Sequence, residues 1–247
     1  MKKEAECIIL PDIHGRDFWK RVFSDDCKWV TDNYVFLGDY FDPYPSEGIT
    51  VDKAIINWHE LMNAINEWKA SHPEDNFFFL MGNHDAHYIS RVFNAISGGC
   101  RQSTNPEIPR LLTSMRLNIA CELRIANRHV LFSHAGVMAK WYHAHEELIG
   151  ELSAQHLNEL CNTDEGWRAL ADCDFYRGGL YDYGSPLWAD IRLRKEHENE
   201  LQDFGYDYQI VGHTQIRSGK PIIMDAIADI DCHKPFALTN DFKLNTI

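Results

Sequence analysis

Five short motifs constrain the fold of this chain more than any other feature of its sequence. Each pairs a glycine with an Asp, Asn or His and follows a short apolar run. The motifs lie at residues 12–15 (DIHG), 38–42 (GDYFD), 82–85 (GNHD), 133–136 (SHAG) and 212–214 (GHT). An apolar run that stops at a polar turn with glycine is typical of a buried strand followed by a loop. Sites in α/β proteins lie beyond the carboxyl ends of strands, so the motifs predict an α/β fold with a site at its strand ends.

The first two motifs carry carboxylates. Asp12 and His14 are two residues apart after the apolar run at residues 7–10. Alternate side chains of an extended chain point the same way, so both can face one ion. Asp39 follows a second apolar run at residues 34–37, and its two oxygens can bridge two metals. Because divalent metals bind carboxylate oxygens and imidazole nitrogens, these residues are candidate ligands.

The other three motifs add amide and imidazole groups. Asn83 offers a neutral amide oxygen, and His134 and His213 offer imidazoles, each after its own apolar run. Glycine with Asp or Asn is also common turn chemistry, so one such motif alone would indicate only a turn. Five in this order are hard to explain as turns. Together they could hold two divalent metals and still leave an acid for catalysis.

In identity and order these motifs resemble those of the calcineurin-like metallophosphoesterase superfamily, over residues 12–214. The resemblance implies a four-layer fold, with two packed mixed β-sheets between outer helices, in one domain over residues 1–247. It also implies two divalent metal ions, Mn first, with Fe or Zn as alternatives. One ion would be held by Asp12, His14 and Asp39, and Asp39 would bridge to the other. The second ion's remaining ligands would be Asn83, His134 and His213.

The resemblance further implies hydrolysis of phosphate esters. In such a two-metal site, a water molecule between the ions is acidified and attacks phosphorus in line with the leaving oxygen. His84 lies next to a predicted ligand, and a histidine titrates near neutral pH, so it is the predicted general acid. Asp42 matches the carboxylate that orients this histidine in the family. Both residues are therefore predicted to be catalytic.

The predicted phosphate contacts depart from the family pattern. Phosphoprotein phosphatases usually have an arginine directly after the second Asp of the second motif, where this chain has Pro43. A bidentate arginine is therefore missing at that place. The segment 185–192 (SPLWADIR) looks like one that precedes the last histidine of those phosphatases, so Arg192 is the first candidate for phosphate binding. Arg177 and Arg91 are further candidates.

Two substrates and one non-enzymatic role remain open. Gln215 replaces a second histidine that many relatives carry and the phosphoprotein phosphatases lack, and Asp42 also favours that branch. Its substrate would be a phosphoprotein or a small phosphate ester. Residues 82–87 (GNHDAH), with His134 and Trp141, resemble the symmetrical diadenosine tetraphosphatases instead. An inactive relative that serves as a binding module would have lost predicted ligands, and this chain has lost none.

The remaining sequence predicts alternating strands and helices. Apolar residues recur at helical spacing over residues 50–71, after a threonine N-cap. The Gly, Pro, Ser and Asn content of residues 97–109 predicts a loop. Residues 141–174 are predicted to be helical, and to form either a cap over the metals or an outer layer without substrate contact. Residues 222–224 and 236–238 are predicted closing strands.

Composition fits a folded enzyme and limits its partners. The chain has 247 residues, of which 45% are apolar, enough for a substantial core. Its formal net charge of −13 would fall only to about −9 with two divalent ions, so nucleic acid is an unlikely partner. No segment resembles a membrane span or a signal peptide. The seven cysteines include no CxxC pair, which favours reduced thiols and a cytoplasmic protein.

Overall fold

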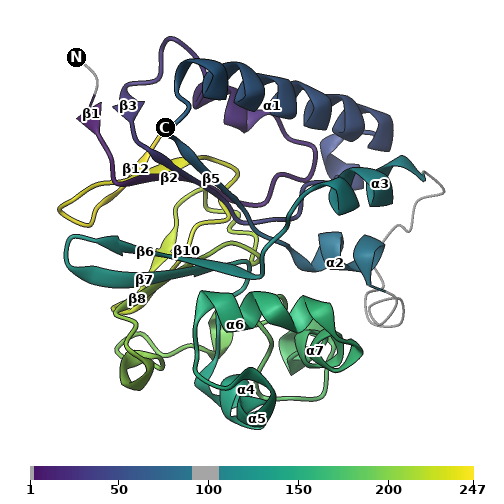
Figure 1. The fold of residues 1–247 in the computed structure, drawn as a ribbon, viewed down its shortest axis with the longest axis vertical. Coiled ribbons are helices and arrows are strands. Elements are labelled where there is room, and N and C mark those ends of the chain that lie inside the picture. The colour runs from purple at the N-terminus through teal and green to yellow at the C-terminus, as the bar shows by residue number, and fades with distance from the viewer. Residues whose placement is uncertain (1–2, 91–105) are drawn as a thin grey trace.

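The computed structural model describes residues 3–90 and 106–247. Two five-stranded sheets pack face to face, and helices cover the outer face of each (Figure 1). Each sheet contains both parallel and antiparallel pairs. The predicted α/β fold, with two packed mixed sheets between outer helices, is therefore confirmed. Arg91 lies outside the described residues, as does most of the predicted loop at 97–109.

The first sheet carries three of the five motifs and has the strand order β12-β11-β2-β4-β5. Its strands β2 (Cys7–Leu10), β4 (Asn33–Phe36) and β5 (Asn76–Phe79) are parallel. Antiparallel pairing adds β11 (Phe236–Leu238) and β12 (Leu244–Thr246), so one predicted closing strand is confirmed. Because parallel strands end at one edge of a sheet, the first three motif loops emerge together.

The second sheet carries the other two motifs and has the order β6-β7-β8-β10-β9. Its strands β7 (Arg128–Ser133) and β8 (Tyr208–Val211) are parallel and lead into the fourth and fifth motifs. β6 (Ala120–Ile125) pairs antiparallel with β7, and β10 (Ile227–Asp229) pairs parallel with β8. The edge strand β9 (Ile222–Ile223) confirms the other predicted closing strand.

An apolar core fills the space between the sheets. Strands of both sheets contribute to it, including Ile9, Val35, Phe132, Ile210 and Ala228. These strands are buried on both faces, which is why they are near-continuous apolar runs without strict alternation. The sheets therefore hold the motif loops on a rigid base.

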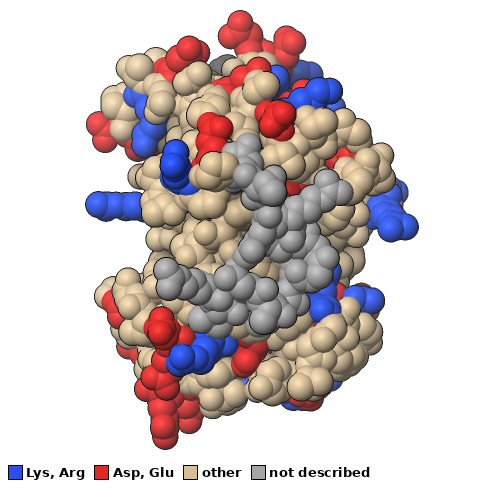
Figure 2. Space-filling model, turned by 90° about the vertical axis from the view of Figure 1, so that its right-hand side faces the viewer, with Lys and Arg blue, Asp and Glu red and all other residues tan. Residues whose placement is uncertain are grey.

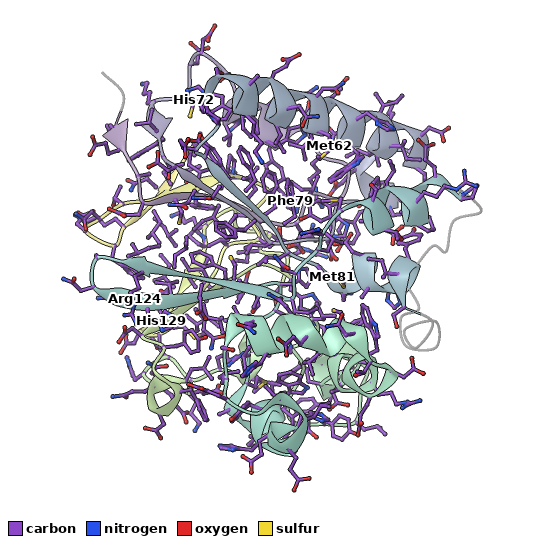
Figure 3. The ribbon with its side chains drawn as sticks, in the orientation of Figure 1. Met62, His72, Phe79, Met81, Arg124 and His129 are labelled. Carbon is purple, nitrogen blue, oxygen red and sulfur yellow. The ribbon has the colours of Figure 1, made fainter. Side chains whose placement is uncertain are left out.

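The helix α1 (Val51–Ser71) covers the outer face of the first sheet (Figure 1). The side chain of Thr50 caps it by accepting the backbone N–H of Lys53 at 3.2 Å. Met62 of this helix and Phe79 of β5 belong to the core between helix and sheet (Figure 3). The predicted helix and its cap are confirmed.

Four short helices cover the outer face of the second sheet (Figure 1). They are α4 (Ala139–Ala144), α5 (Glu146–Ile149), α6 (Ala154–Glu159) and α7 (Asp164–Leu170). Their apolar residues share one core with Leu131 of β7. The helical prediction for residues 141–174 is confirmed, whereas their contact with substrate stays a prediction.

Between α1 and β6, the described residues form the helices α2 (Asn83–Ile89) and α3 (Glu107–Ser114). The predicted loop at 97–109 was therefore wrong at its end, where Ile108 and Pro109 are helical. Ile108 is fully buried and packs in the core under α1. Pro109 lies in the first helical turn, where the missing N–H removes no helical hydrogen bond. Packing thus overrides the loop-like composition.

The remaining elements are short. β1 (Lys3–Glu4) pairs with β3 (Trp29–Val30). Short 3-10 helices span Phe18–Arg21, Pro45–Glu47, Leu160–Asn162, Phe175–Arg177, Ile191–Leu193 and Gln202–Phe204. Within the described ranges, none of the helices combines the length and the apolar character that crossing a membrane requires. Acidic and basic side chains are interspersed on the face in Figure 2.

Candidate metal centre

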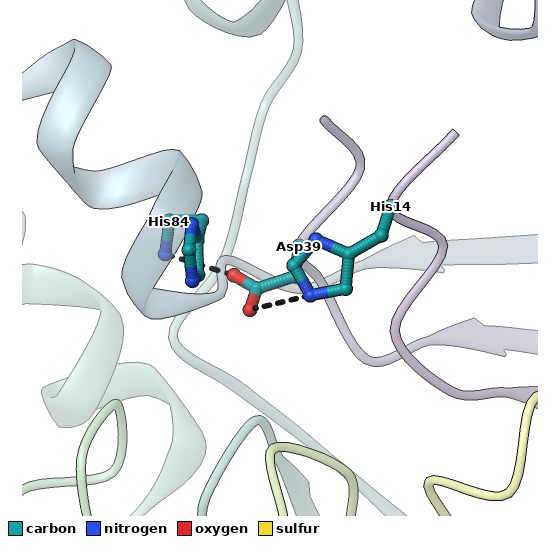
Figure 4. A group of neighbouring side chains, drawn as sticks. All are labelled: His14, Asp39 and His84. Atoms are coloured by element: carbon teal, nitrogen blue, oxygen red, sulfur yellow. Dashed lines mark hydrogen bonds and ion pairs between the residues drawn. The ribbon is translucent and has the colours of Figure 1, made fainter. Parts of the chain in front are cut away.

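The motif loops bring their predicted ligands together at the strand ends. Ligand atoms of Asp12, Asp39 and His134 lie within 4.8 Å of one another, and so do those of His14, Asp39 and His84. Asp39 belongs to both groups, as expected of a bridging carboxylate. Figure 4 shows it between the two histidines of the second group.

Asp39 is held in this position by contacts to both of its oxygens. Its Oδ1 accepts the backbone N–H of His84 at 2.9 Å. Its Oδ2 lies 3.5 Å from Nε2 of His14 and 3.5 Å from Nε2 of His134. The carboxylate is almost fully buried, so its orientation is fixed before any ion binds.

Backbone carbonyls orient two of the imidazoles. Nδ1 of His14 lies 2.8 Å from the carbonyl oxygen of Phe41, and Nδ1 of His134 lies 2.9 Å from that of Leu37. A carbonyl can only accept, so each Nδ1 donates and each Nε2 is left with its lone pair. This arrangement is typical of histidines that bind a metal through Nε2.

A second set of candidate metal-ligand atoms lies around His134. Its Nε2 lies 2.9 Å from Oδ1 of Asn83 and 3.0 Å from Nδ1 of His213. The Asp12 carboxylate accepts the backbone N–H of His213 at 3.1 Å. Nε2 of His213 is buried and has no hydrogen-bond partner among the described residues. Nitrogen and oxygen donors that converge in this way are the ligand set expected for a divalent ion.

The loops are also strained. His14, Asp39, Asp42 and His213 have positive φ angles of 43°, 51°, 58° and 71°. Each such residue costs about 1–3 kcal/mol and persists only where the surroundings impose it. Gly38 has a φ of 107°, and a Cβ there would lie 2.4 Å from the backbone nitrogen of Gly82. Close loop packing therefore imposes the backbone that aims the ligands.

Several buried carboxyl groups lie close together at this site. Burial raises the pKa of Asp12, and the neighbouring Asp231 and Asp39 raise it further. Burial also raises the pKa of Asp229, and it raises that of Asp231 to about 7. Each of these last two carboxyl groups has a buried oxygen without a hydrogen-bond partner among the described residues. Cations would relieve this repulsion.

The histidines of the site are neutral, which is the form that binds metals. Burial lowers the pKa of His14 to about 3. Burial also lowers the pKa of His134 and of His213, and the charge of Arg177 adds to the effect at His213. The residues present therefore fit two divalent ions.

His84 differs from these histidines. Its Nδ1 lies 3.0 Å from Oδ2 of Asp42, and its side chain is 17% exposed. Burial alone would lower its pKa, but the charge of Asp39 and the hydrogen bond to Asp42 outweigh burial and raise the pKa to about 9. Tyr88 donates its hydroxyl hydrogen to the other oxygen of Asp42 at 2.5 Å. The structure thus brings together the two residues that the sequence predicts to be catalytic.

Sequence reasoning assigned no role to Asp85. Its buried carboxylate accepts three backbone N–H groups, from Asp39 at 2.7 Å, Gly82 at 2.9 Å and Tyr40 at 3.1 Å. It therefore ties the loop of the second motif to that of the third. An acidic residue three positions after an N-cap is the signal that could have indicated this.

The structure places the two described arginine candidates, Arg192 and Arg177, in different surroundings. Arg192 has a side chain that is 54% exposed, and its Nε and terminal nitrogen bind Asp190, each at 2.8 Å. Arg177 also pairs with Asp190 and donates to Oγ1 of Thr214 at 2.7 Å, next to the ligand His213. Of the two predicted arginines that the structure describes, Arg177 is therefore the one that contacts a motif loop of the candidate metal centre.

Comparison with known proteins agrees with this geometry. Residues 7–217 match the calcineurin-like phosphoesterase family. The fold is similar to a cold-active protein tyrosine phosphatase, with 18% identity over 99% of this chain and 79% of that one, at a TM-score of 0.57. A cold-active protein tyrosine phosphatase from a psychrophilic Shewanella species has 17% identity over 99% and 80% of the two chains, at a TM-score of 0.55.

A serine/threonine phosphatase of Saccharomyces cerevisiae, similar to human phosphatase PP5, also shares the fold. Its identity is 15% over 98% of this chain and 79% of that one, and its TM-score is 0.55. Because the family match covers most of the chain, this protein belongs to the calcineurin-like phosphoesterases. It is a metal-dependent phosphoesterase, and members of its superfamily depend on a dinuclear metal site.

Proposed function

We propose that this protein is a phosphomonoesterase of the phosphoprotein-phosphatase type. The observation that carries the proposal is the pair formed by His84 and Asp42, 3.0 Å apart, directly beside Asp39. This pair gives the site a proton donor in addition to its metal ligands. An inactive binding module would have no need of such a donor.

The metal ligands of the proposed site follow the predicted sets. Asp12, His14 and Asp39 hold one ion. Asp39 would also hold a second ion, whose other ligands would be Asn83, His134 and His213. Oxygen and nitrogen ligands suit Mn, Fe or Zn, and Mn is our first choice. Bound ions would supply an acidified water molecule as nucleophile and neutralise charge on the phosphoryl oxygens.

The chain's own residues manage the proton and the phosphate. Asp42 orients the His84 ring and stabilises its charged form. His84 then gives its proton to the leaving oxygen, which therefore departs as a neutral alcohol. Positive ions nearby would lower the pKa of His84 from about 9 toward neutrality, where an acid transfers its proton most effectively. Arg177 binds a phosphoryl oxygen, and Arg192 remains the alternative.

The test is hydrolysis of a substrate panel by Mn-loaded protein. The panel contains phenyl phosphate, an aryl phosphodiester, a phosphoserine peptide and diadenosine tetraphosphate. Turnover of the monoester and the peptide, both abolished in Asp39→Asn, is the expected result. Preference for the dinucleotide would assign the protein to the diadenosine tetraphosphatase type instead. No turnover with two bound metals per chain would favour a binding module.

We further propose that residues 1–247 act as one domain in the cytoplasm. The cysteines at described positions are free thiols, and all but Cys161 are buried. Reduced, buried thiols are what a reducing compartment maintains. Titration of the denatured, unreduced protein with a thiol reagent would count its free thiols. Fewer than seven free thiols would contradict this location.

A further inference from the structure

Exposed apolar side chains gather in one short stretch of the described chain. Six large apolar side chains are exposed among the described residues, and four of them fall between positions 175 and 181. We call these four the apolar rim: Phe175, Tyr176, Leu180 and Tyr181. Single exposed apolar residues are ordinary, whereas a cluster indicates an interaction surface.

The apolar rim stands on a fixed backbone. The buried carboxylate of Asp174 accepts the backbone N–H of Tyr176 at 2.8 Å and that of Asp190 at 2.7 Å. The backbone N–H of Phe175 donates to the carbonyl of Tyr181 at 2.9 Å and so joins the two ends of the stretch. An ordered loop that nevertheless exposes apolar side chains is pre-organised for binding.

Arg177 connects the apolar rim to the metal centre. It lies within the stretch, yet its guanidinium donates to Thr214 at 2.7 Å, beside the ligand His213. The guanidinium of Arg192 lies 4.2 Å from the ring centroid of Tyr176 and supports that ring. A substrate whose phosphate reached Arg177 would therefore have its next groups over the apolar rim.

We propose that the apolar rim binds the polypeptide of a phosphoprotein substrate through apolar side chains next to the phosphorylated residue. This inference rests on the proposed phosphatase function. The apolar rim combines three aromatic rings with one aliphatic side chain. The exposed aliphatic Leu180 (94%) suits a side chain of the same kind rather than a flat ring.

The experiment compares two phosphoserine peptides that differ only in the flanking residues, Leu and Phe in one and Ser in the other. The proteins are the Mn-loaded wild type and the double variant Leu180→Ser/Tyr181→Ser. Ile56→Ser and Ile223→Ser are matched controls, because these residues are each 58% exposed and lie outside the apolar rim. Unfolding temperatures check that every variant is folded.

We expect the wild type to prefer the apolar peptide by about tenfold in kcat/KM. The double variant loses this preference through a higher KM, whereas both controls keep it. Hydrolysis of free phosphoserine should be unchanged in all four proteins, because it does not reach the apolar rim.

Equal hydrolysis of both peptides by the wild type would overturn the inference, and so would a preference that survives in the double variant. A double variant impaired only with diadenosine tetraphosphate would assign the surface to a nucleobase and overturn it as well. Failure of the proposed function is distinguishable: the wild type would then hydrolyse neither the peptides nor free phosphoserine.

Discussion

The metal centre buries polar side chains, and the apolar rim beside it exposes apolar ones. Each region thus reverses the usual distribution of side chains in a folded protein. In the metal centre the backbone is strained and donor atoms converge without partners. In the apolar rim, hydrogen bonds hold the backbone while apolar side chains are exposed to solvent. The comparison is the basis of our two proposals, that ions bind in one region and an apolar segment of the substrate in the other.

Asp39→Asn tests the metal centre most severely. We expect turnover to be lost and metal affinity to fall more than about a hundredfold, since outer partners alone cost 10- to 100-fold. Elemental analysis of the dialysed protein measures the bound metal, and phenyl phosphate hydrolysis measures turnover. The exposed Asp25→Asn is the matched control. Full turnover in Asp39→Asn would contradict the bridging role.

His84→Asn separates the proton donor from the ligands. We expect kcat to fall by about 10²–10⁴ for phenyl phosphate while both metals stay bound. The loss should be smaller for a nitrophenyl ester, because its leaving oxygen needs no proton. Metal analysis matters here, since His84 also groups with His14 and Asp39. Loss of one metal would make His84 a ligand instead.

Asp85→Asn tests the support under Asp39. An amide would turn an N–H₂ group toward a backbone N–H, so the free energy of unfolding should fall by about 1–3 kcal/mol. Urea unfolding of the metal-free protein measures this. Asp203→Asn, at an exposed site, should change it little. An unchanged stability would mean that the three hydrogen bonds have no structural role.

Arg177→Ala and Arg192→Ala compare the two arginines. We expect KM for phenyl phosphate to rise about tenfold or more in Arg177→Ala, because a charged hydrogen bond is lost. Arg192→Ala should change KM less than about twofold, since the Arg192 side chain is 54% exposed and solvent screens its charge. The reverse ranking would restore Arg192 as the phosphate-binding residue.

Thr50→Ala affects neither region and should have the smallest effect. Loss of its N-cap hydrogen bond to α1 is expected to lower the free energy of unfolding by about 1 kcal/mol. Urea unfolding measures this loss, and kcat/KM should not change. A change in kcat/KM would show that α1 is coupled to the metal centre.

The sequence predicted the fold because its strands are buried on both faces and so are visible as apolar runs. It predicted that Asp12, Asp39 and His134 would lie close together, as they do, because each follows the end of a strand within three residues and parallel strands end together. It missed α3 at Pro109, where the burial of Ile108 outweighs composition. The role of Asp85 needed the loops' positions, because its partners are 3 to 46 residues away.

The sequence by itself determined the donor atoms, their order along the chain and the class of chemistry they allow. Only the tertiary structure brought Arg177 rather than Arg192 to the last motif, because loops bring Arg177 to Thr214 across 37 residues. It also decided which apolar residues face water: Leu180 is 94% exposed and Leu187, seven positions on, is fully buried. Local sequence carries ligand identity, whereas exposure depends on which distant segments pack against a residue.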